Sequence, residues 1–147
     1  MIEEIIKEKT SADHLLYVSL KYTKTGDIIQ NLIFRWRVMI DECFTSMLER
    51  AKKRKIIKSI PSIPKLRIDL IQSIFSKEEA VAKILELYDF FKRIDVLEKF
   101  SENEFRKNVT LKVIYRGQMI DINIDKLKEY NAAVEKFISY VKQFLSA

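Results

Sequence analysis

Hydrophobic residues along most of the chain recur at the spacing of one face of an α-helix. In the clearest case, apolar positions follow one another at intervals of four, three, four, three and four residues. The members of this seam are Ile29, Ile33, Trp36, Ile40, Cys43 and Met47. A seam of this period packs against another helix at a shallow angle. We therefore predict a long helix from about Asp27 to Lys55.

Similar patterns predict the other helices. A seam near the end of the chain, with Asp125 as its predicted N-cap and an end near Leu145, consists of Leu127, Tyr130, Val134, Phe137, Val141 and Phe144. Shorter amphipathic stretches predict a helix from Ala12 to about Lys24, capped by Thr10 or Ser11, and another from Lys65 to Phe75. Ser76 and Glu79 form a capping box that is expected to open a helix ending near Ile94.

Two breaks separate these helices. Gly26 interrupts the pattern, either as a true break with Thr25 or Asp27 as the new cap, or as a weak point in a continuing helix. The sequence SIPSIP, Ser59–Pro64, disfavours helix and predicts an extended connector. Pro64 is also suited to the first position of the helix that follows.

The clear β signal is a pair of alternating segments, Val109–Tyr115 and Met119–Ile124, on either side of Arg116-Gly117. A tight turn there places Val113 opposite Ile120, Leu111 opposite Ile122 and Val109 opposite Ile124. It also places Lys112 opposite Asp121 and Thr110 opposite Asn123. A slip of one residue would destroy these matches. The turn is expected to have two residues, or four in the same register. The polar stretch Ser101–Asn108 precedes the hairpin.

The predicted fold is mainly α. We expect one domain of residues 1–147, with an up-down bundle of about four or five helices and one antiparallel hairpin at about 109–124 before the C-terminal helix. A hairpin alone is marginally stable in water, so it must pack on the bundle. The chain has only two Gly and two Pro, which agrees with long helices and few turns.

Charge is concentrated in one segment. The net charge is +6, yet eight basic residues and no acidic one lie between Arg50 and Arg67, which leaves −2 for the rest. The eight are Arg50, Lys52, Lys53, Arg54, Lys55, Lys58, Lys65 and Arg67. A helix dipole explains cations on the last turns of the long helix, but not those beyond its end. Phosphates attract such a cluster whatever the nucleotide sequence.

The sequence offers little catalytic chemistry. Its one His, His14, lies at the edge of a polar band formed by Asp13, Tyr17, Lys21 and Lys24. The band is interpreted in one of two ways. It is a solvent-exposed helix face, or His14 within it acts as an acid–base group or contacts phosphate. A catalytic triad normally uses His as its base, and a lone His is not a site by itself. The chain has no Gly-rich phosphate loop either.

The sequence also contains no recognisable pattern of metal ligands. One Cys, Cys43, and one His do not make a zinc site within one chain. Carboxylates could still bind magnesium, and the candidate ligands are Asp13, Asp27, Asp41 and Glu42. Asp27, Asn31 and Arg35 share a helical face, as a surface ion-pair series or as a buried polar network. We predict no metal and no cofactor.

The segment Ser11–Ile29, SADHLLYVSLKYTKTGDII, is similar to a segment of small uncharacterised archaeal helical proteins. The order of elements also resembles that of HEPN-type helical domains, several of which act on RNA. The catalytic signature of those domains is an Arg followed a few residues later by His. Here no Arg precedes His14. The resemblance therefore implies a similar fold without ribonuclease activity. No catalytic residue of these domains is assigned to a position in this sequence.

These observations favour a non-enzymatic binding protein that contacts RNA or DNA through Arg50–Arg67. The alternative is a structural or protein–protein interaction module, a homodimer whose basic segment has no nucleic-acid role. A carboxylate- and metal-dependent enzyme ranks third. The start of the chain lacks the pattern of a secretory signal. No apolar run approaches the roughly 18 residues of a transmembrane span. We therefore expect a cytoplasmic protein.

Overall fold

The computed structural model describes residues 2–147, and it confirms a mainly α fold with a small sheet before the last helix. The elements are α1 (Ile2–His14), the π-helix η1 (Leu15–Ser19), α2 (Leu20–Tyr22), α3 (Gly26–Lys53), α4 (Pro64–Phe75), α5 (Glu79–Arg93), β1 (Lys99–Glu102), β2 (Thr110–Tyr115), β3 (Gln118–Ile122) and α6 (Ile124–Ser146). Residues at the junctions of α1, η1 and α2 have helical dihedral angles, so these three elements form one continuous helix.

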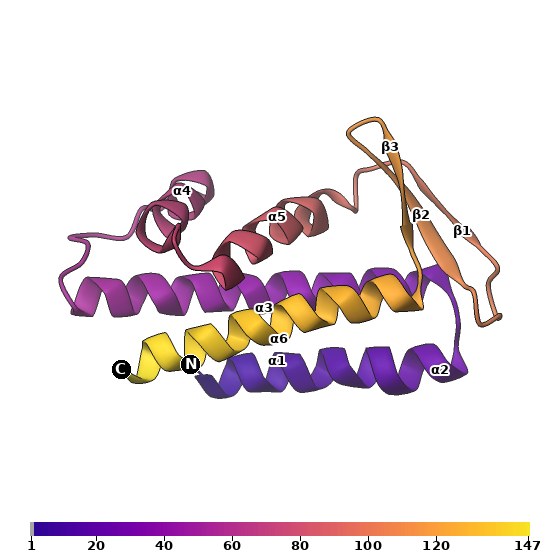
Figure 1. The fold of residues 1–147 in the computed structure, drawn as a ribbon, viewed down its shortest axis with the longest axis horizontal. Coiled ribbons are helices and arrows are strands. Elements are labelled where there is room, and N and C mark those ends of the chain that lie inside the picture. The colour runs from indigo at the N-terminus through magenta and orange to yellow at the C-terminus, as the bar shows by residue number, and fades with distance from the viewer. Residues whose placement is uncertain (1) are drawn as a thin grey trace.

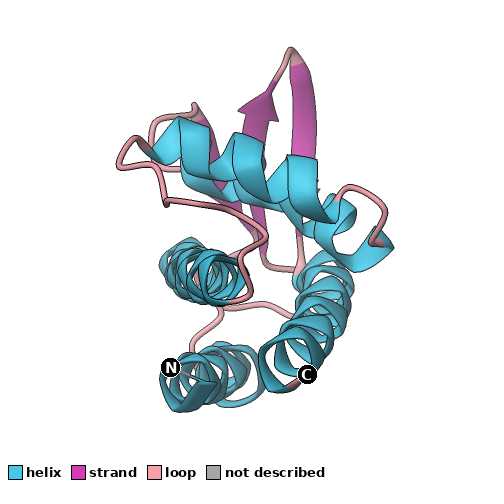
Figure 2. Ribbon diagram, turned by 90° about the vertical axis from the view of Figure 1, so that its left-hand side faces the viewer, coloured by secondary structure: helices cyan, strands magenta, loops and turns pink. Residues whose placement is uncertain are grey.

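The elements form two layers. Figure 1 shows the helix α1–α2, helix α3 and helix α6 running side by side along the length of the molecule. Helices α4 and α5 and the sheet lie together on one side of them, as the end view in Figure 2 shows. Buried side chains from both layers form one hydrophobic cluster. The predicted packing of the hairpin on the helices is therefore observed.

Aromatic side chains join the long helices to α5. Trp36 of α3 is fully buried, and its ring centroid lies 5.9 Å from that of Phe91 in α5 and 6.5 Å from that of Tyr130 in α6. Further along α3, the ring of Phe44 lies 5.7 Å from that of Phe137 in α6. Such pairs stabilise a core beyond the area that they bury. Both seams predicted from the sequence therefore face one another across this core.

The predicted start of the first helix at Thr10 or Ser11 is wrong, because the chain is helical from Ile2. The Thr10 hydroxyl donates to the main-chain oxygen of Ile6, 2.9 Å away, which is a bond made within a helix rather than a cap. Ile5 is fully buried in the core. Burial of this first turn against the bundle decides its conformation, and the cap-like residues do not.

The break at Gly26 is real. The first helix ends at Tyr22, and the Thr25 hydroxyl caps α3 by accepting from the N–H of Ile28 at 3.4 Å. Gly26 is buried against the sheet, where an added Cβ would lie 1.9 Å from the Ser101 hydroxyl oxygen. A side chain at this position would require the Ser101 hydroxyl to move, and its Cβ would still lie 3.1 Å from the Ser101 Cβ, so glycine fits this close approach of β1 to the helix.

The connector after α3 agrees with the prediction, but the capping box does not. Pro64 is the first residue of α4, after an extended Ile63. Ser76 has helical dihedral angles and ends α4, so its backbone cannot adopt the extended conformation of an N-cap. Glu78 takes the N-cap position of α5 without a side-chain capping bond. The expected hydrogen bonds between Ser76 and Glu79 are therefore not formed.

The predicted hairpin register is confirmed. Val113 pairs with Ile120, Leu111 with Ile122, and Lys112 with Asp121. The two turn residues have φ angles of 51° and 76°, the left-handed conformation of a two-residue hairpin turn.

Two further predictions about this region are wrong. The pairing stops at Leu111–Ile122 and does not reach Val109–Ile124 or Thr110–Asn123. Asn123 instead caps α6, accepting from the N–H of Lys126 at 2.8 Å, so Asp125 is not the N-cap. The segment after α5 also forms a strand that was not predicted, β1, which begins before the polar stretch and pairs antiparallel with β2. Edge strands are often short and polar, which explains why the alternation rule missed it.

No helix of residues 2–147 combines the length and the apolar composition that crossing a membrane requires.

The close approach at Gly26 gives a stability test. Alanine at a helix start normally stabilises relative to glycine. Here we expect Gly26→Ala to lower the free energy of unfolding by about 1–3 kcal/mol, because the new methyl group overlaps Ser101. Ser101→Ala in the same chain should recover part of this loss, and Ser101→Ala alone should have little effect. Urea unfolding monitored by circular dichroism measures all three. A stabilised Gly26→Ala variant would contradict the contact.

Candidate functional site

The eight basic residues predicted as a binding segment lie around one end of the molecule, where α3 ends and the connector to α4 begins (Figure 1). The connector leaves α3 through Lys55, which has a φ of 62°. The N–H of Ile56 donates to the main-chain oxygen of Ala51 at 2.9 Å, and that of Lys55 donates to Lys52 at 3.0 Å. This is the bonding pattern of a Schellman motif, with lysine in the place that glycine usually takes.

The three arginines of this segment donate hydrogen bonds to main-chain oxygens elsewhere in the fold. Arg50 donates to the main-chain oxygen of Ala147 at 2.8 Å, and Arg54 donates to that of Phe144 at 2.8 Å. The guanidinium of Arg54 also lies 4.8 Å from the centre of the Phe144 ring. Arg67 donates to the main-chain oxygen of Pro61 at 2.6 Å, across the connector. A planar guanidinium suits such stacking and main-chain contacts better than an ammonium does.

The five lysines of the segment are exposed to solvent. We call them the lysine surface: Lys52, Lys53, Lys55, Lys58 and Lys65. All five are exposed. Among the ion pairs of the described residues, none involves a member of the lysine surface. The structure thus divides the predicted segment into structural arginines and exposed lysines, a division that the charge pattern alone did not indicate.

The polar band around His14 is interrupted by the π-helix η1, and Lys24 lies beyond the end of the helix. The π-helix η1 adds a residue to the turn between Asp13 and Lys21, so the spacing of an uninterrupted α-helix no longer applies. Asp13 pairs with Lys9, and the Tyr17 hydroxyl accepts from the Asn131 amide at 3.2 Å. His14 is exposed. Lys24 donates to the main-chain oxygen of Lys21.

The candidate metal ligands are not brought together. Residues 2–147 hold no group of three or more His, Cys, Asp or Glu side chains placed to bind a metal ion. Asp27 is exposed, and Asp41 accepts from the Tyr88 hydroxyl. Glu42 lies near Glu8 and Glu4, and burial, with these two charges, raises the pKa of its carboxyl.

Two other residues considered as chemical groups have structural surroundings. Cys43 is buried, and burial raises the pKa of its thiol to about 12, so the reactive thiolate is suppressed. Asn31 is exposed, and Arg35 pairs with Glu8 of α1 at 3.6 Å. The series Asp27, Asn31 and Arg35 is therefore a surface feature rather than a buried network.

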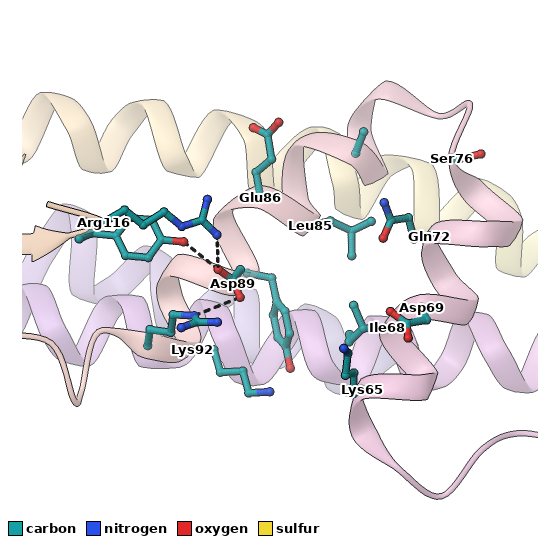
Figure 3. Close-up of a pocket in the computed structure, with 14 residues that line it drawn as sticks. Lys65, Ile68, Asp69, Gln72, Ser76, Leu85, Glu86, Asp89, Lys92 and Arg116 are labelled. Atoms are coloured by element: carbon teal, nitrogen blue, oxygen red, sulfur yellow. Dashed lines mark hydrogen bonds and ion pairs between the residues drawn. The ribbon is translucent and has the colours of Figure 1, made fainter. Parts of the chain in front are cut away.

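A groove that the sequence did not reveal lies between α4, α5 and the β2–β3 turn, with a volume of about 890 Å³ (Figure 3). At its centre, Asp89 of α5 accepts from the Tyr115 hydroxyl at 2.7 Å, from Arg93 at 3.3 Å and from Arg116 at 3.3 Å. Lys65 of the lysine surface lines the same groove. The Asp89–Arg93 spacing of four residues was visible in the sequence, but the contacts with the hairpin were not.

The groups around Asp89 favour the charged form of its carboxyl. The hydrogen bond from Tyr115 and the charges of Arg93 and Arg116 hold the pKa of Asp89 below its usual range, although burial acts the other way. A carboxyl of this kind is a poor general acid near neutral pH, because it has no proton to donate. The cluster instead ties the hairpin to α5.

No family model, curated protein or solved structure matches this chain. The resemblance to small archaeal proteins and to HEPN-type domains stays a prediction.

The Asp89 cluster predicts a pH dependence of stability. Because folding lowers the pKa of Asp89, its carboxylate stabilises the folded chain above the unfolded pKa of about 3.9. This contribution is lost as the pH falls through the lower pKa of the folded state. We expect Asp89→Asn to lower stability at pH 7 by less than about 1 kcal/mol, because solvent screens the exposed arginines.

The same variant should lose less stability than the wild type between neutral pH and about pH 2, since the charge is already absent. Urea unfolding midpoints measured over this pH range test the prediction. Parallel pH profiles for the two proteins would contradict it.

Proposed function

We propose that this protein is a non-enzymatic binding protein that contacts nucleic acid, RNA or DNA, through the lysine surface. The observation that supports this most directly is the exposure of five lysines at one end of the molecule, none paired with a carboxylate within the described residues. Lysines in such a cluster neutralise phosphates and release the counterions condensed on them. We assign the protein to the cytoplasm, where it would meet such a partner.

The surroundings of the lysine surface support a polyanion more than a lipid bilayer. Ile56 is half exposed, but its position follows from the Schellman motif that ends α3. Ile63 and Leu66 are 56% and 48% exposed and lie at the start of α4. These three aliphatic side chains, one after the end of α3 and two at the start of α4, do not make the continuous apolar face with which a helix enters a membrane interface.

The test reverses the charges that the structure shows to be exposed. We expect Lys55→Glu, Lys58→Glu and Lys65→Glu together to weaken binding of a fluorescent single-stranded RNA. The slope of log K against log salt should fall by about 2, since three phosphate contacts are lost. Lys58 lies in the connector and Lys65 in the first turn of α4, where the helix dipole favours a carboxylate, so only Lys55, in the motif that ends α3, faces an unfavourable dipole. Fluorescence anisotropy at several salt concentrations measures both quantities.

The matched control changes the net charge equally at exposed lysines outside the segment and outside the groove that Lys65 lines, Lys83, Lys128 and Lys136. Its binding should fall much less than that of the test variant. An equal loss of RNA affinity in the two variants would show a non-specific charge effect and contradict the proposal. Binding to anionic lipid vesicles, but not to RNA or DNA, would identify a membrane partner instead.

A homodimer is a second candidate, and the outer face of the sheet favours it. The register places Ile114 opposite Met119 on the face away from the core, and Phe100 lies on the same face. Phe100 and Met119 are 45% and 49% exposed. The neighbouring charges of Lys112 and Asp121 are paired at 3.2 Å, so covering this face leaves no new unpaired charge.

Sedimentation equilibrium tests this candidate. A dimer formed through the sheet should dissociate in Met119→Lys, because two-fold symmetry brings the substituted side chain into the interface from both chains. The matched control Phe34→Lys changes an equally exposed apolar residue of α3 and should leave the dimer intact. A wild-type protein that stays monomeric at high concentration would exclude the dimer.

A further inference from the structure

An exposed aromatic residue marks the opposite end of the molecule. The loop between β1 and β2, residues 103–108, lies at the end of the long helices away from the lysine surface (Figure 1). Phe105 in this loop is 75% exposed. Arg106 and Lys107 follow it and are exposed as well. This ring therefore contributes little to the hydrophobic core.

The loop backbone is held in place around Phe105. The N–H of Phe105 donates to the main-chain oxygen of Lys24 at 2.6 Å, and the Glu104 carboxylate accepts from the N–H of Gly26 at 3.3 Å. Phe105 has a φ of 67°, a left-handed conformation that is rare for a bulky side chain. A bulky residue that its surroundings hold in such a conformation is a reason to look for function. Here the residue held in this conformation is aromatic, and its side chain is exposed.

The turn that holds this loop brings a second ring and more cations. Tyr22 ends the first helix two residues before Lys24, and it is 79% exposed. The Lys21 ammonium lies 5.9 Å from the centre of the Tyr22 ring. The loop's carboxylate, Glu104, is engaged with the helix start and does not pair with these cations within the described residues.

We propose that this end of the molecule binds single-stranded nucleic acid. We call the surface the aromatic tip, and its members are Tyr22, Phe105, Lys21, Lys24, Arg106 and Lys107. Unpaired bases stack on the Phe105 and Tyr22 rings, and the four cations contact the phosphates. Surfaces that combine exposed rings with a positive groove or patch bind single strands without sequence preference. A duplex offers no free base faces, so the aromatic tip discriminates against it.

Charge and composition favour this ligand over a membrane. Along the chain, polar and charged residues follow both Tyr22 and Phe105, and residues 103–108 contain no aliphatic side chain. Membrane binding by a loop needs a continuous apolar surface. The alternation of rings and cations is typical of a surface that binds a strand of bases and phosphates.

The aromatic tip is separate from the lysine surface. Helix α3 joins the two ends, and its 28 residues span about 42 Å. A tetranucleotide cannot reach both. The inference rests on the proposed function in taking nucleic acid as the ligand, but its test uses a different end of the protein.

The experiment measures anisotropy of a fluorescent single-stranded tetranucleotide with the full chain. Phe105→Gly should weaken binding about tenfold, through the loss of one stacked base. The same variant should be at least as stable as wild type, because glycine relieves the left-handed conformation. Phe105→Tyr should keep wild-type affinity, and Phe105→Leu should weaken binding about as much as Phe105→Gly does. Tyr22→Ala should lower the affinity by a similar factor.

Two controls separate this inference from the proposed function. Phe34→Ala removes an exposed ring on α3 and should leave tetranucleotide binding unchanged. The triple substitution at Lys55, Lys58 and Lys65 should also leave it unchanged, while weakening binding of long strands. Unchanged tetranucleotide affinity in Phe105→Gly, equal affinity for a short duplex, or binding to anionic vesicles alone would each overturn the inference. None of these three results would affect the test of the lysine surface on long strands.

Discussion

The packing of Trp36 against Phe91 and Tyr130 fixes the arrangement on which the other features depend. The Trp36 side chain is fully buried where α3, α5 and α6 meet. It sets the positions of α5 and α6 relative to α3, and α5 in turn holds the hairpin through Asp89, Tyr115 and Arg116. A large ring in a close-packed interior leaves few alternative arrangements, because any shift opens a cavity or an overlap. Helix α3, which carries Trp36, joins the two ends of the molecule as one element of 28 residues.

At the end formed by the last turn of α3, residues of the same charge have different roles. Arg50 and Arg54 join α3 to the last turn of α6 through main-chain oxygens, and Arg67 folds the connector back on itself. The lysines between them remain in solvent. Arginine's fixed, planar donors suit main-chain oxygens, whereas a flexible ammonium keeps its hydration and suits a mobile phosphate chain. Stability and the proposed binding role are thereby separated within one segment.

At the other end, close contact between helix and sheet shapes the surface. Gly26 allows β1 to approach the start of α3, and the loop after β1 is then bonded to Lys24 and Gly26. These contacts hold Phe105 in its left-handed conformation with the ring exposed. The surface is therefore organised before any ligand binds, which lowers the entropy lost on binding.

The sequence by itself determined the long helices and the hairpin register, because each depends on local periodicity or on pairs of nearby residues. It left open whether Gly26 breaks the first helix, and the contact between Gly26 and β1 decided that. The sequence did not determine β1, the helical first turn or the capping of α6. Those follow from burial and pairing with distant segments, which outweigh local preferences. The same holds for function. The sequence located the basic segment, but only the tertiary structure assigned its arginines to the fold and joined the Phe105 loop to the turn after Tyr22, since both results depend on contacts between residues far apart in the chain.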